Sequence, residues 1–524
     1  MRFRLIFALS GRLVLIYCIA PLLFCLFSIG FGYWQEMAAF GWTIVLGGIP
    51  AYVASKWFRE PAVIHRAEAM CVVALTWLSA AVISGIPYFV AGRLSPIDAL
   101  FESMSGLTTT GATILTDFTR FSKMLFFWRA TTQWFGGLGV ISLFVIIMPR
   151  FGIAGRQILF TESSSAAGEA LDVDVREHAS KLILLYIGLT MICAFGLYAT
   201  QMSIFDSAAH ALTTLSAGGF SPNGASISGY ANPSAEWVLI VFMILAGASF
   251  PLQYKVMTGF RNGAWRELFS DPEWLVYLGV AIFGGLSVGI LYNNVLTEES
   301  FRTGLFQSAS LISSTGFASL DYNEWSDSAK AVLVLIMLVG GCAGSAAGGP
   351  KVIRHILAAK HMARELKQSL MPNARFNITL NGKVVTISQV RAIFLVIMLY
   401  GIGFVLVGCL LALTGQELVT AFSAALACLG NVGPGFNSIG PMGSFGGLPP
   451  IAKIILIGAM WVGRLEIVTL MALLHPLAWR SARWSDPEVV RRRLPKVRQR
   501  RERLRTGAVL NDEQSNLHDS NRNE

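Results

Sequence analysis

Four segments of the chain share one pattern, in which a short apolar stretch ends in small polar residues and glycine. They read ALFESMSGLTTTG (residues 99–111), DSAAHALTTLSAG (206–218), GLFQSASLISSTG (304–316) and AFSAALACLGNVG (421–433). The copies recur at intervals of about 100 residues, and a longer apolar run lies on each side of every copy. The apolar part of each copy is too short to cross a bilayer, where a helix needs about 20 apolar residues. Each copy therefore predicts a spanning helix, a re-entrant half-helix, an extended loop and a second spanning helix.

The composition indicates a membrane protein. The chain has 524 residues, of which 54% are hydrophobic and only 14% charged, whereas a soluble domain carries about 25% charged residues. The net charge of +10 comes from short basic clusters between apolar runs. This distribution is typical of the positive-inside rule and argues against a nucleic-acid partner. The seven cysteines have no metal-binding spacing and are interpreted as packing residues.

The apolar runs predict about ten crossings of the membrane. They lie near residues 5–31, 37–56, 68–91, 122–149, 180–202, 235–260, 273–294, 328–366, 390–414 and 450–478. Basic residues gather in every second loop, which predicts that these loops and both termini are cytoplasmic. The predicted domains are an N-terminal hairpin (1–66), four repeats (67–150, 178–266, 271–367 and 388–480) and a basic, polar cytoplasmic tail (484–524). The tail is interpreted as a topology signal that also contacts anionic membrane lipids.

These repeats predict a pore. Non-helical backbone at bilayer depth persists only where it lines water or protein, and rings of backbone carbonyl groups from four loops replace the water shell of potassium in channels. Glycine allows the positive φ that turns successive carbonyl groups toward one axis. Close helix packing is the simpler explanation for small residues, but four copies favour a pore. The candidate potassium ligands are Thr109, Thr110, Gly111, Ser216, Ala217, Gly218, Ser314, Thr315, Gly316, Asn431, Val432 and Gly433.

The sequence therefore predicts an all-α membrane protein. Four pseudo-symmetric helix–pore loop–helix repeats surround a central pore, and an extra N-terminal two-helix hairpin precedes them. Potassium is the expected transported ion, and no organic cofactor is expected in this chain.

A glycine-rich stretch interrupts the predicted span 328–366, and we call residues 340–349 the glycine loop. Its candidate gate residues are Gly340, Gly341, Gly344, Ser345, Gly348 and Gly349. Glycine costs a helix about 1 kcal/mol per residue relative to alanine, so we expect a break here, below the third repeat's loop. A flexible kink without any gating role is the simpler interpretation.

Arg464 lies within the last predicted span. A charge at that depth costs roughly 2.5–3.5 kcal/mol on insertion scales, so it should face protein or water. We expect its guanidinium group to donate to carbonyl groups of the glycine loop and to place positive charge in the cation path. An arginine closer to the interface would instead extend toward the headgroups. Glu466 does not share the helical face of Arg464, so no ion pair between them is expected. Lys351 is interpreted as a cytoplasmic anchor rather than a pore residue.

Other polar residues near the four copies have simpler explanations than ion binding. His210 is interpreted as a packed residue rather than a pH sensor. Asp98, Asp206 and Glu417 could concentrate cations at the mouth, but helix capping is the simpler role. A secondary carrier that couples potassium to sodium or protons remains the main alternative. No nucleophile–base or metal-binding arrangement predicts an enzyme.

The repeats resemble the filter loops of the Trk/Ktr/HKT superfamily, in particular its TrkH-type members. The resemblance extends to WRATTQWFGG (128–137), the glycine loop and GRLE (463–466). It implies potassium uptake across the bacterial inner membrane by a homodimer, with the glycine loop as gate and a cytosolic nucleotide-binding ring of the TrkA type as regulator. It also implies that the filter glycines are Gly111, Gly218, Gly316 and Gly433. The second copy departs from the family pattern, because Ala217 stands where threonine often precedes the glycine.

Overall fold

The computed structural model describes residues 2–57, 64, 66–146, 170–293, 295, 297–374, 376–474 and 476. Within these residues the chain is mostly helical, and the only strands are β1 (Ile378–Leu380) and β2 (Lys383–Val385), an antiparallel pair. The predicted all-α class is therefore confirmed. The predicted tail at 484–524 lies outside the described residues, as does the end of the predicted span 122–149.

The N-terminal hairpin forms as predicted. Helices α1 (Phe3–Tyr17) and α2 (Ile19–Gly30) make one apolar run, and α3 (Trp34–Thr43), a π-helical turn (Ile44–Gly48) and α4 (Ile49–Ser55) return alongside it. Gly11 lets α1 and α4 approach closely, since a Cβ atom there would lie 2.6 Å from the carbonyl oxygen of Ala51. The aromatic rings of Phe24 and Phe40 pack edge-on against Trp128, with centroids 5.0 and 5.3 Å away. These contacts fix the hairpin to the first repeat.

Four repeats follow, and each contains a long helix, a short helix, a loop and a second helix. The first two comprise α5 (Arg66–Val90), α6 (Pro96–Leu107) and α7 (Lys123–Ile146), then α10 (Ala170–Ala199), α11 (Ile204–Leu215), α12 (Pro233–Gly247) and α13 (Phe250–Gly259). The last two comprise α14 (Pro272–Asn293), α15 (Glu298–Ile312), α16 (Asp327–Val339) and α17 (Val352–Leu370), then α18 (Ile387–Leu413), α19 (Leu418–Leu429), α20 (Pro450–Arg464) and α21 (Ile467–Leu474). The short helices have 12, 12, 15 and 12 residues, so none is long enough to span a bilayer.

Hydroxyl side chains begin three of the four short helices. The side chains of Ser95, Ser203 and Thr297 accept a hydrogen bond from the backbone N–H of the third helical residue in α6, α11 and α15. Such N-caps satisfy one of the amide groups that a helix start leaves without a partner. Glu417, before α19, makes no such side-chain bond.

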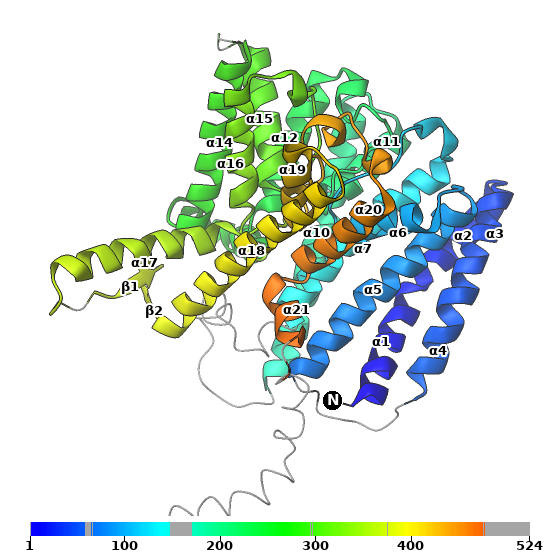
Figure 1. Ribbon diagram of the computed structural model, residues 1–524, viewed down its shortest axis with the longest axis horizontal. Coiled ribbons are helices and arrows are strands. Elements are labelled where there is room, and N and C mark those ends of the chain that lie inside the picture. Colours follow the sequence, from blue (N-terminus) through cyan, green and yellow to red (C-terminus); the bar gives the residue numbers. More distant parts are fainter. Residues whose placement is uncertain are drawn as a thin grey trace, which may run out of the picture.

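The repeats pack in a closed ring. The second helix of each repeat lies against the short helix of the next, so that α7 packs on α11, α12 on α15, α16 on α19 and α20 on α6. The short helices are deeply buried within this ring, and every residue of α15 from Arg302 to Ile312 is buried. Figure 1 shows the helices as one bundle, with the N-terminus, α21 and the arm of α17, β1 and β2 toward its lower end.

Two ion pairs join neighbouring repeats; the pair of Arg302 and Glu236 is nearly buried, whereas the Asp98 side chain of the second pair is 25% exposed. Arg302 of α15 lies 2.7 Å from the carboxylate of Glu236 on α12, and Lys453 of α20 lies 2.6 Å from Asp98 on α6. Removing one partner of a buried pair leaves an uncompensated charge, which costs about 3–5 kcal/mol. These pairs therefore hold the short helices against the ring.

Among the residues that the structure describes, six helices are long and apolar enough to cross a membrane, or seven if the bent pair α12 and α13 is counted as one span. The predicted span 235–260 is wrong as a continuous helix, because the chain bends by 103° between α12 and the helix that starts at Phe250. Pro251 near this start has no N–H group, and the N–H of Phe250 donates to Gly344 instead of continuing α12. The predicted span 450–478 is also interrupted, since α20 ends at Arg464 and Glu466 has a φ of 60°.

Candidate functional site

The loops after the four short helices share one backbone conformation. We number them loop 1 (108–111), loop 2 (216–219), loop 3 (313–316) and loop 4 (430–433); each begins at the C-cap of its short helix. The second residue of every loop is left-handed, with φ of 51°, 54°, 54° and 52° at Thr109, Ala217, Ser314 and Asn431. The fourth is a glycine with positive φ: 83°, 73°, 81° and 105° at Gly111, Gly219, Gly316 and Gly433. Non-glycine residues rarely adopt a left-handed conformation, so four matching pairs of such residues mark one repeated structure.

The register that the sequence predicts for the second copy differs by one residue from the register in the structure. Gly219, not Gly218, has the positive φ and matches Gly111. The error arose because two adjacent glycines follow Ala217, and only the end of α11 at Leu215 decides between them. Gly218 instead occupies the position of Thr110 in loop 1.

The four loops contact one another in a closed cycle. A Cβ atom built on the glycine of one loop would overlap the preceding carbonyl oxygen of the next loop. The distances are 2.2 Å from Gly111 to Gly218, 1.8 Å from Gly219 to Thr315, 2.1 Å from Gly316 to Val432 and 2.7 Å from Gly433 to Thr110. Because the cycle returns to its start, the loops surround one common axis. No side chain fits at these four positions without displacing a neighbouring loop.

In two of the loops, a hydrogen bond between side-chain hydroxyl groups links the first and third residues. The hydroxyl oxygens of Thr108 and Thr110 lie 2.8 Å apart in loop 1, and those of Ser313 and Thr315 are also 2.8 Å apart in loop 3. Loop 4 is joined to loop 1 instead, since Asn431 Nδ2 donates to the Thr110 hydroxyl at 2.9 Å. Loop 2 has no second hydroxyl, because its third residue is Gly218.

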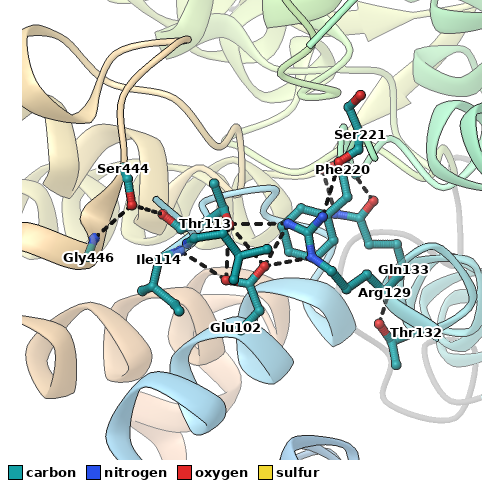
Figure 2. Close-up of polar contacts among 12 residues, drawn as sticks. Glu102, Thr113, Ile114, Arg129, Thr132, Gln133, Phe220, Ser221, Ser444 and Gly446 are labelled. Carbon is teal, nitrogen blue, oxygen red and sulfur yellow. Dashed lines mark hydrogen bonds and ion pairs between the residues drawn. The ribbon is translucent and has the colours of Figure 1, made fainter. Parts of the chain in front are cut away.

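A buried ion pair supports loops 1 and 2 (Figure 2). Arg129 on α7 lies 2.6 Å from the carboxylate of Glu102 on α6, and both side chains are almost fully buried. The same guanidinium group donates to the Ser221 carbonyl oxygen at 3.1 Å and stacks 3.9 Å from the centre of the Phe220 ring. The Glu102 carboxylate also accepts from the backbone N–H of Ile114 at 2.9 Å. One pair of charges thus fixes the extended segments that follow loops 1 and 2.

In the second and third repeats, a different polar side chain occupies the position of Glu102 and also binds the segment after the loop. His210 and Gln307 occupy the position of Glu102 in α11 and α15. His210 Nε2 lies 3.1 Å from the Ser221 hydroxyl, and Gln307 Nε2 donates to the Phe317 carbonyl oxygen at 3.2 Å. The three side chains align in the sequence once the second copy is shifted by one residue.

His210 is a packed residue, as its sequence context indicated. Its Nδ1 atom lies 2.7 Å from the Asp206 carbonyl oxygen, which can only accept a hydrogen bond. Nδ1 therefore carries the proton, and Nε2 accepts from the Ser221 hydroxyl in the neutral ring. The side chain is fully buried.

A cavity opens on the axis and is lined by residues of all four repeats. It is lined by Gly111, Ala112, Thr113, Phe118, Arg129, Gly219, Phe220, Ser221, Asn223, Gly224, Ser226, Gly316, Pro434, Gly440, Pro441, Gly443 and Phe445. The glycines of loops 1 to 3, together with Pro434 directly after loop 4, thus line a single shared space.

Three acidic residues near the mouth have specific partners. Asp98 pairs with Lys453, Asp206 accepts from the Tyr230 hydroxyl at 2.9 Å, and Glu417 accepts from the amide of Asn437 at 3.0 Å. Asp98 and Asp206 also accept from the serine that caps their helix. Ser95 and Ser203 are themselves the N-caps, and the two aspartates bind the hydroxyl groups of these serines.

The glycine loop breaks the helix as predicted and lies against the bend in α12. The N–H groups of Cys342 and Ala346 donate to the carbonyl oxygens of Gly247 and Ala246. At its other side, the N–H of Gly348 donates to the Ser314 hydroxyl in loop 3 at 2.6 Å. A Cβ atom on Gly348 would lie 2.3 Å from the Gly430 carbonyl oxygen of loop 4. The glycine loop thus lies directly beneath loops 3 and 4.

Arg464 makes the contact expected from the sequence. Its guanidinium group donates to the Ala346 carbonyl oxygen of the glycine loop at 3.0 Å and to Gly136 at 3.3 Å. The residue is only 6% exposed. Glu466 binds Arg354 at 2.8 Å rather than Arg464. The anchor interpretation of Lys351 is wrong, because its ammonium group turns back to the Ala347 carbonyl oxygen.

Comparisons with known proteins agree with this architecture. The TrkH family model, described as a cation transport protein, matches residues 34–478. The chain is 31% identical over 432 residues to the Trk system potassium uptake protein TrkH of Salmonella typhimurium, covering 81% of this chain and 88% of that protein. It is 32% identical over 496 residues to TrkH of Halomonas elongata, covering 92% and 100%. The crystal structure of the potassium transporter TrkH from Vibrio parahaemolyticus superposes with a TM-score of 0.82 at 30% identity, covering 91% of this chain and 100% of that one.

Proposed function

Because this chain belongs to the TrkH family of cation transport proteins, we propose that it takes up potassium through a pore bounded by loops 1 to 4. It is a multi-pass membrane protein and a transporter rather than an enzyme. The relatives named as potassium uptake proteins support potassium as the transported ion.

The cyclic contact of the four loops is the observation that carries this proposal. Four equivalent turns around one axis offer rings of backbone carbonyl oxygens, one from each loop. Such rings replace the hydration shell of a bare cation, and potassium channels select their ion in this way. The candidate ligands are therefore the carbonyl groups of the second, third and fourth loop residues, with Gly219 replacing Ser216 in the set predicted for loop 2.

The glycine loop and Arg464 form the proposed gate. The glycine loop lies beneath loops 3 and 4, and its hydrogen bonds to Ser314 and to the bend in α12 hold it across the route from the axis. Arg464 fixes the Ala346 carbonyl group and adds a positive charge beside that route. A like charge repels an approaching cation most strongly where little water screens it. Opening requires these contacts to break.

The proposed setting is the bacterial inner membrane, with both termini cytoplasmic. The basic residues of α17, which include Lys360, Arg364 and Lys367, would then lie on the cytoplasmic side. We propose a homodimer regulated by a TrkA-type nucleotide-binding ring, since the sequence resemblance implies both partners and this chain carries no nucleotide-binding fingerprint of its own. The arm formed by α17, β1 and β2 extends from the bundle and is accessible to such a partner (Figure 1).

Tracer uptake tests the function. The purified full-length chain in proteoliposomes should accumulate radioactive rubidium in preference to sodium when the interior is held negative. The rate should follow the imposed potential without a sodium or proton gradient. Equal uptake of rubidium and sodium would refute a potassium pore. Slow uptake with fixed coupling to sodium or protons would instead support the carrier that broken helices also permit.

A further inference from the structure

Loop 2 lacks the side chain that closes loops 1 and 3. In those loops, the third residue is a threonine whose hydroxyl group pairs with the first residue at 2.8 Å. Loop 2 has Ser216 in the first position but Gly218 in the third, so this pair cannot form. The Ser216 hydroxyl donates only to carbonyl groups of α11. Gly218 does not have a positive φ, so its backbone does not itself require glycine.

The side chain of Gln133 occupies the space where a threonine would lie. A Cβ atom built on Gly218 would fall 2.4 Å from Gln133 Cδ, 2.5 Å from Oε1 and 2.8 Å from Nε2. These three atoms are its nearest neighbours. Gln133 is fully buried and reaches loop 2 from α7, the second helix of the preceding repeat.

The Gln133 amide forms hydrogen bonds with the backbone of loop 2 on both sides of Gly219. Nε2 donates to the Gly218 carbonyl oxygen at 2.7 Å, and Oε1 accepts from the N–H of Phe220 at 3.1 Å. Arg129 lies one helical turn earlier on the same face of α7 and holds Ser221 and the Phe220 ring (Figure 2). Two side chains of repeat 1 thus hold residues 218 to 221 of repeat 2.

We propose that Gln133 substitutes for the missing side chain of loop 2 and, with Arg129, sets the conformation of that loop and so the ion selectivity. The inference rests on the proposed pore. It assigns part of the selectivity to two positioning residues outside the filter sequence. It also explains why loop 2 tolerates a sequence without threonine, since a threonine and Gln133 cannot share the same space.

A double-substitution experiment tests this assignment. We expect Gln133→Ala to reduce the potassium-over-sodium permeability ratio by about tenfold, because two backbone groups lose buried partners. Gly218→Thr alone should reduce the ratio similarly, because the new side chain overlaps the amide of Gln133. The double variant should recover to within about threefold of the unmodified protein, because the new hydroxyl can pair with Ser216 as Thr315 does with Ser313. Additive losses in the double variant would overturn the proposal.

Two further variants separate a local effect from a folding defect. Gln133→Glu keeps the size of the side chain but removes the donor to Gly218, so it should also reduce the ratio. Asn232 is the matched control: its Nδ2 donates to Thr200 at 2.7 Å and its Oδ1 accepts from Ala235 at 3.1 Å, away from the four loops. Asn232→Ala should leave the ratio unchanged. An unchanged ratio in Gln133→Glu, or an equal loss in Asn232→Ala, would contradict the assignment.

Thermal unfolding in detergent separates this inference from the proposed function. The four proteins compared are the unmodified chain, Gln133→Ala, Gly218→Thr and the double variant. If the unmodified chain does not discriminate potassium from sodium, the proposed function fails. The substitutions at residues 133 and 218 must still be non-additive in melting temperature if their side chains compete for one space. Additive changes would overturn the inference whatever the transport result.

Discussion

Substituting serine for Gly316 should weaken potassium selectivity through a defined steric conflict. The residue has a φ of 81°, and an L-residue in the left-handed region costs roughly 1–2 kcal/mol. Its new Cβ atom would also lie 2.1 Å from the Val432 carbonyl oxygen, whereas real Cβ contacts essentially never fall below 3.0 Å. One of the two loops must therefore move by about 1 Å, which is enough to lose much of a packing contact.

A filter distorted on this scale should lose at least about tenfold in its preference for potassium, since a factor of ten corresponds to only about 1.4 kcal/mol. For two monovalent cations, a tenfold change in permeability ratio moves the bi-ionic reversal potential by about 59 mV. The assay is the reversal potential of the purified protein in planar bilayers, with potassium on one side and sodium on the other.

Gly263 provides the matched control for this substitution. Its φ of 82° is nearly the same, but a Cβ atom there would have no neighbour within 4 Å. Gly263→Ser should therefore carry a similar conformational cost without disturbing the loops, and its reversal potential should equal that of the unmodified protein. A Gly316→Ser variant with an unaltered reversal potential would refute the argument that the loop glycines are needed for close approach.

Two further substitutions probe the buried charges. Arg464→Ala should raise basal rubidium flux by about tenfold, because it removes the hydrogen bond to Ala346 and the positive charge beside the path; unchanged flux at equal protein amount would count against the gate. Glu102→Ala should destabilise the protein by about 3–5 kcal/mol, because Arg129 would remain buried without its partner. Its melting temperature in detergent should fall clearly, whereas substitution of the exposed Glu299 should have little effect; equal melting temperatures would contradict the structural role of the pair.

The sequence predicted the repeated architecture because each copy combines two independent signals. An apolar segment too short to span the membrane predicts a re-entrant helix, and the glycine after it predicts an unusual backbone conformation. Both signals depend on local residue types, so they survive without knowledge of tertiary contacts. The break at the glycine loop was predictable for the same reason, since glycine disfavours helix wherever it lies.

The register of loop 2 and the bend at the end of α12 could not be predicted from the sequences of the repeats alone. Gly218 and Gly219 are chemically identical candidates, and only the end of α11 at Leu215 separates them. The bend had one usable signal, because Pro251 disfavours a helical residue before it. The hydrogen bonds that stabilise the bend come from residues 342 to 346, about 100 positions away, and sequence periodicity cannot reveal them.

The supporting side chains were missed because their partners are distant in sequence. Glu102 and Arg129 are separated by a loop and lie on different helices, and Gln133 contacts a residue of another repeat. The packing of α6 on α7 brings Glu102 to Arg129, and the packing of α7 on α11 brings Gln133 to loop 2. Lys351 was misinterpreted because the chain turns at the end of the glycine loop and directs its ammonium group inward.

Anomalous diffraction from crystals grown in rubidium chloride tests the ring of carbonyl oxygens most directly. A bound cation should give an ordered peak on the axis enclosed by Thr110, Gly218, Thr315 and Val432, at coordination distance from their carbonyl oxygens. Absence of any peak on this axis, with rubidium ordered only elsewhere in the membrane region, would contradict the account.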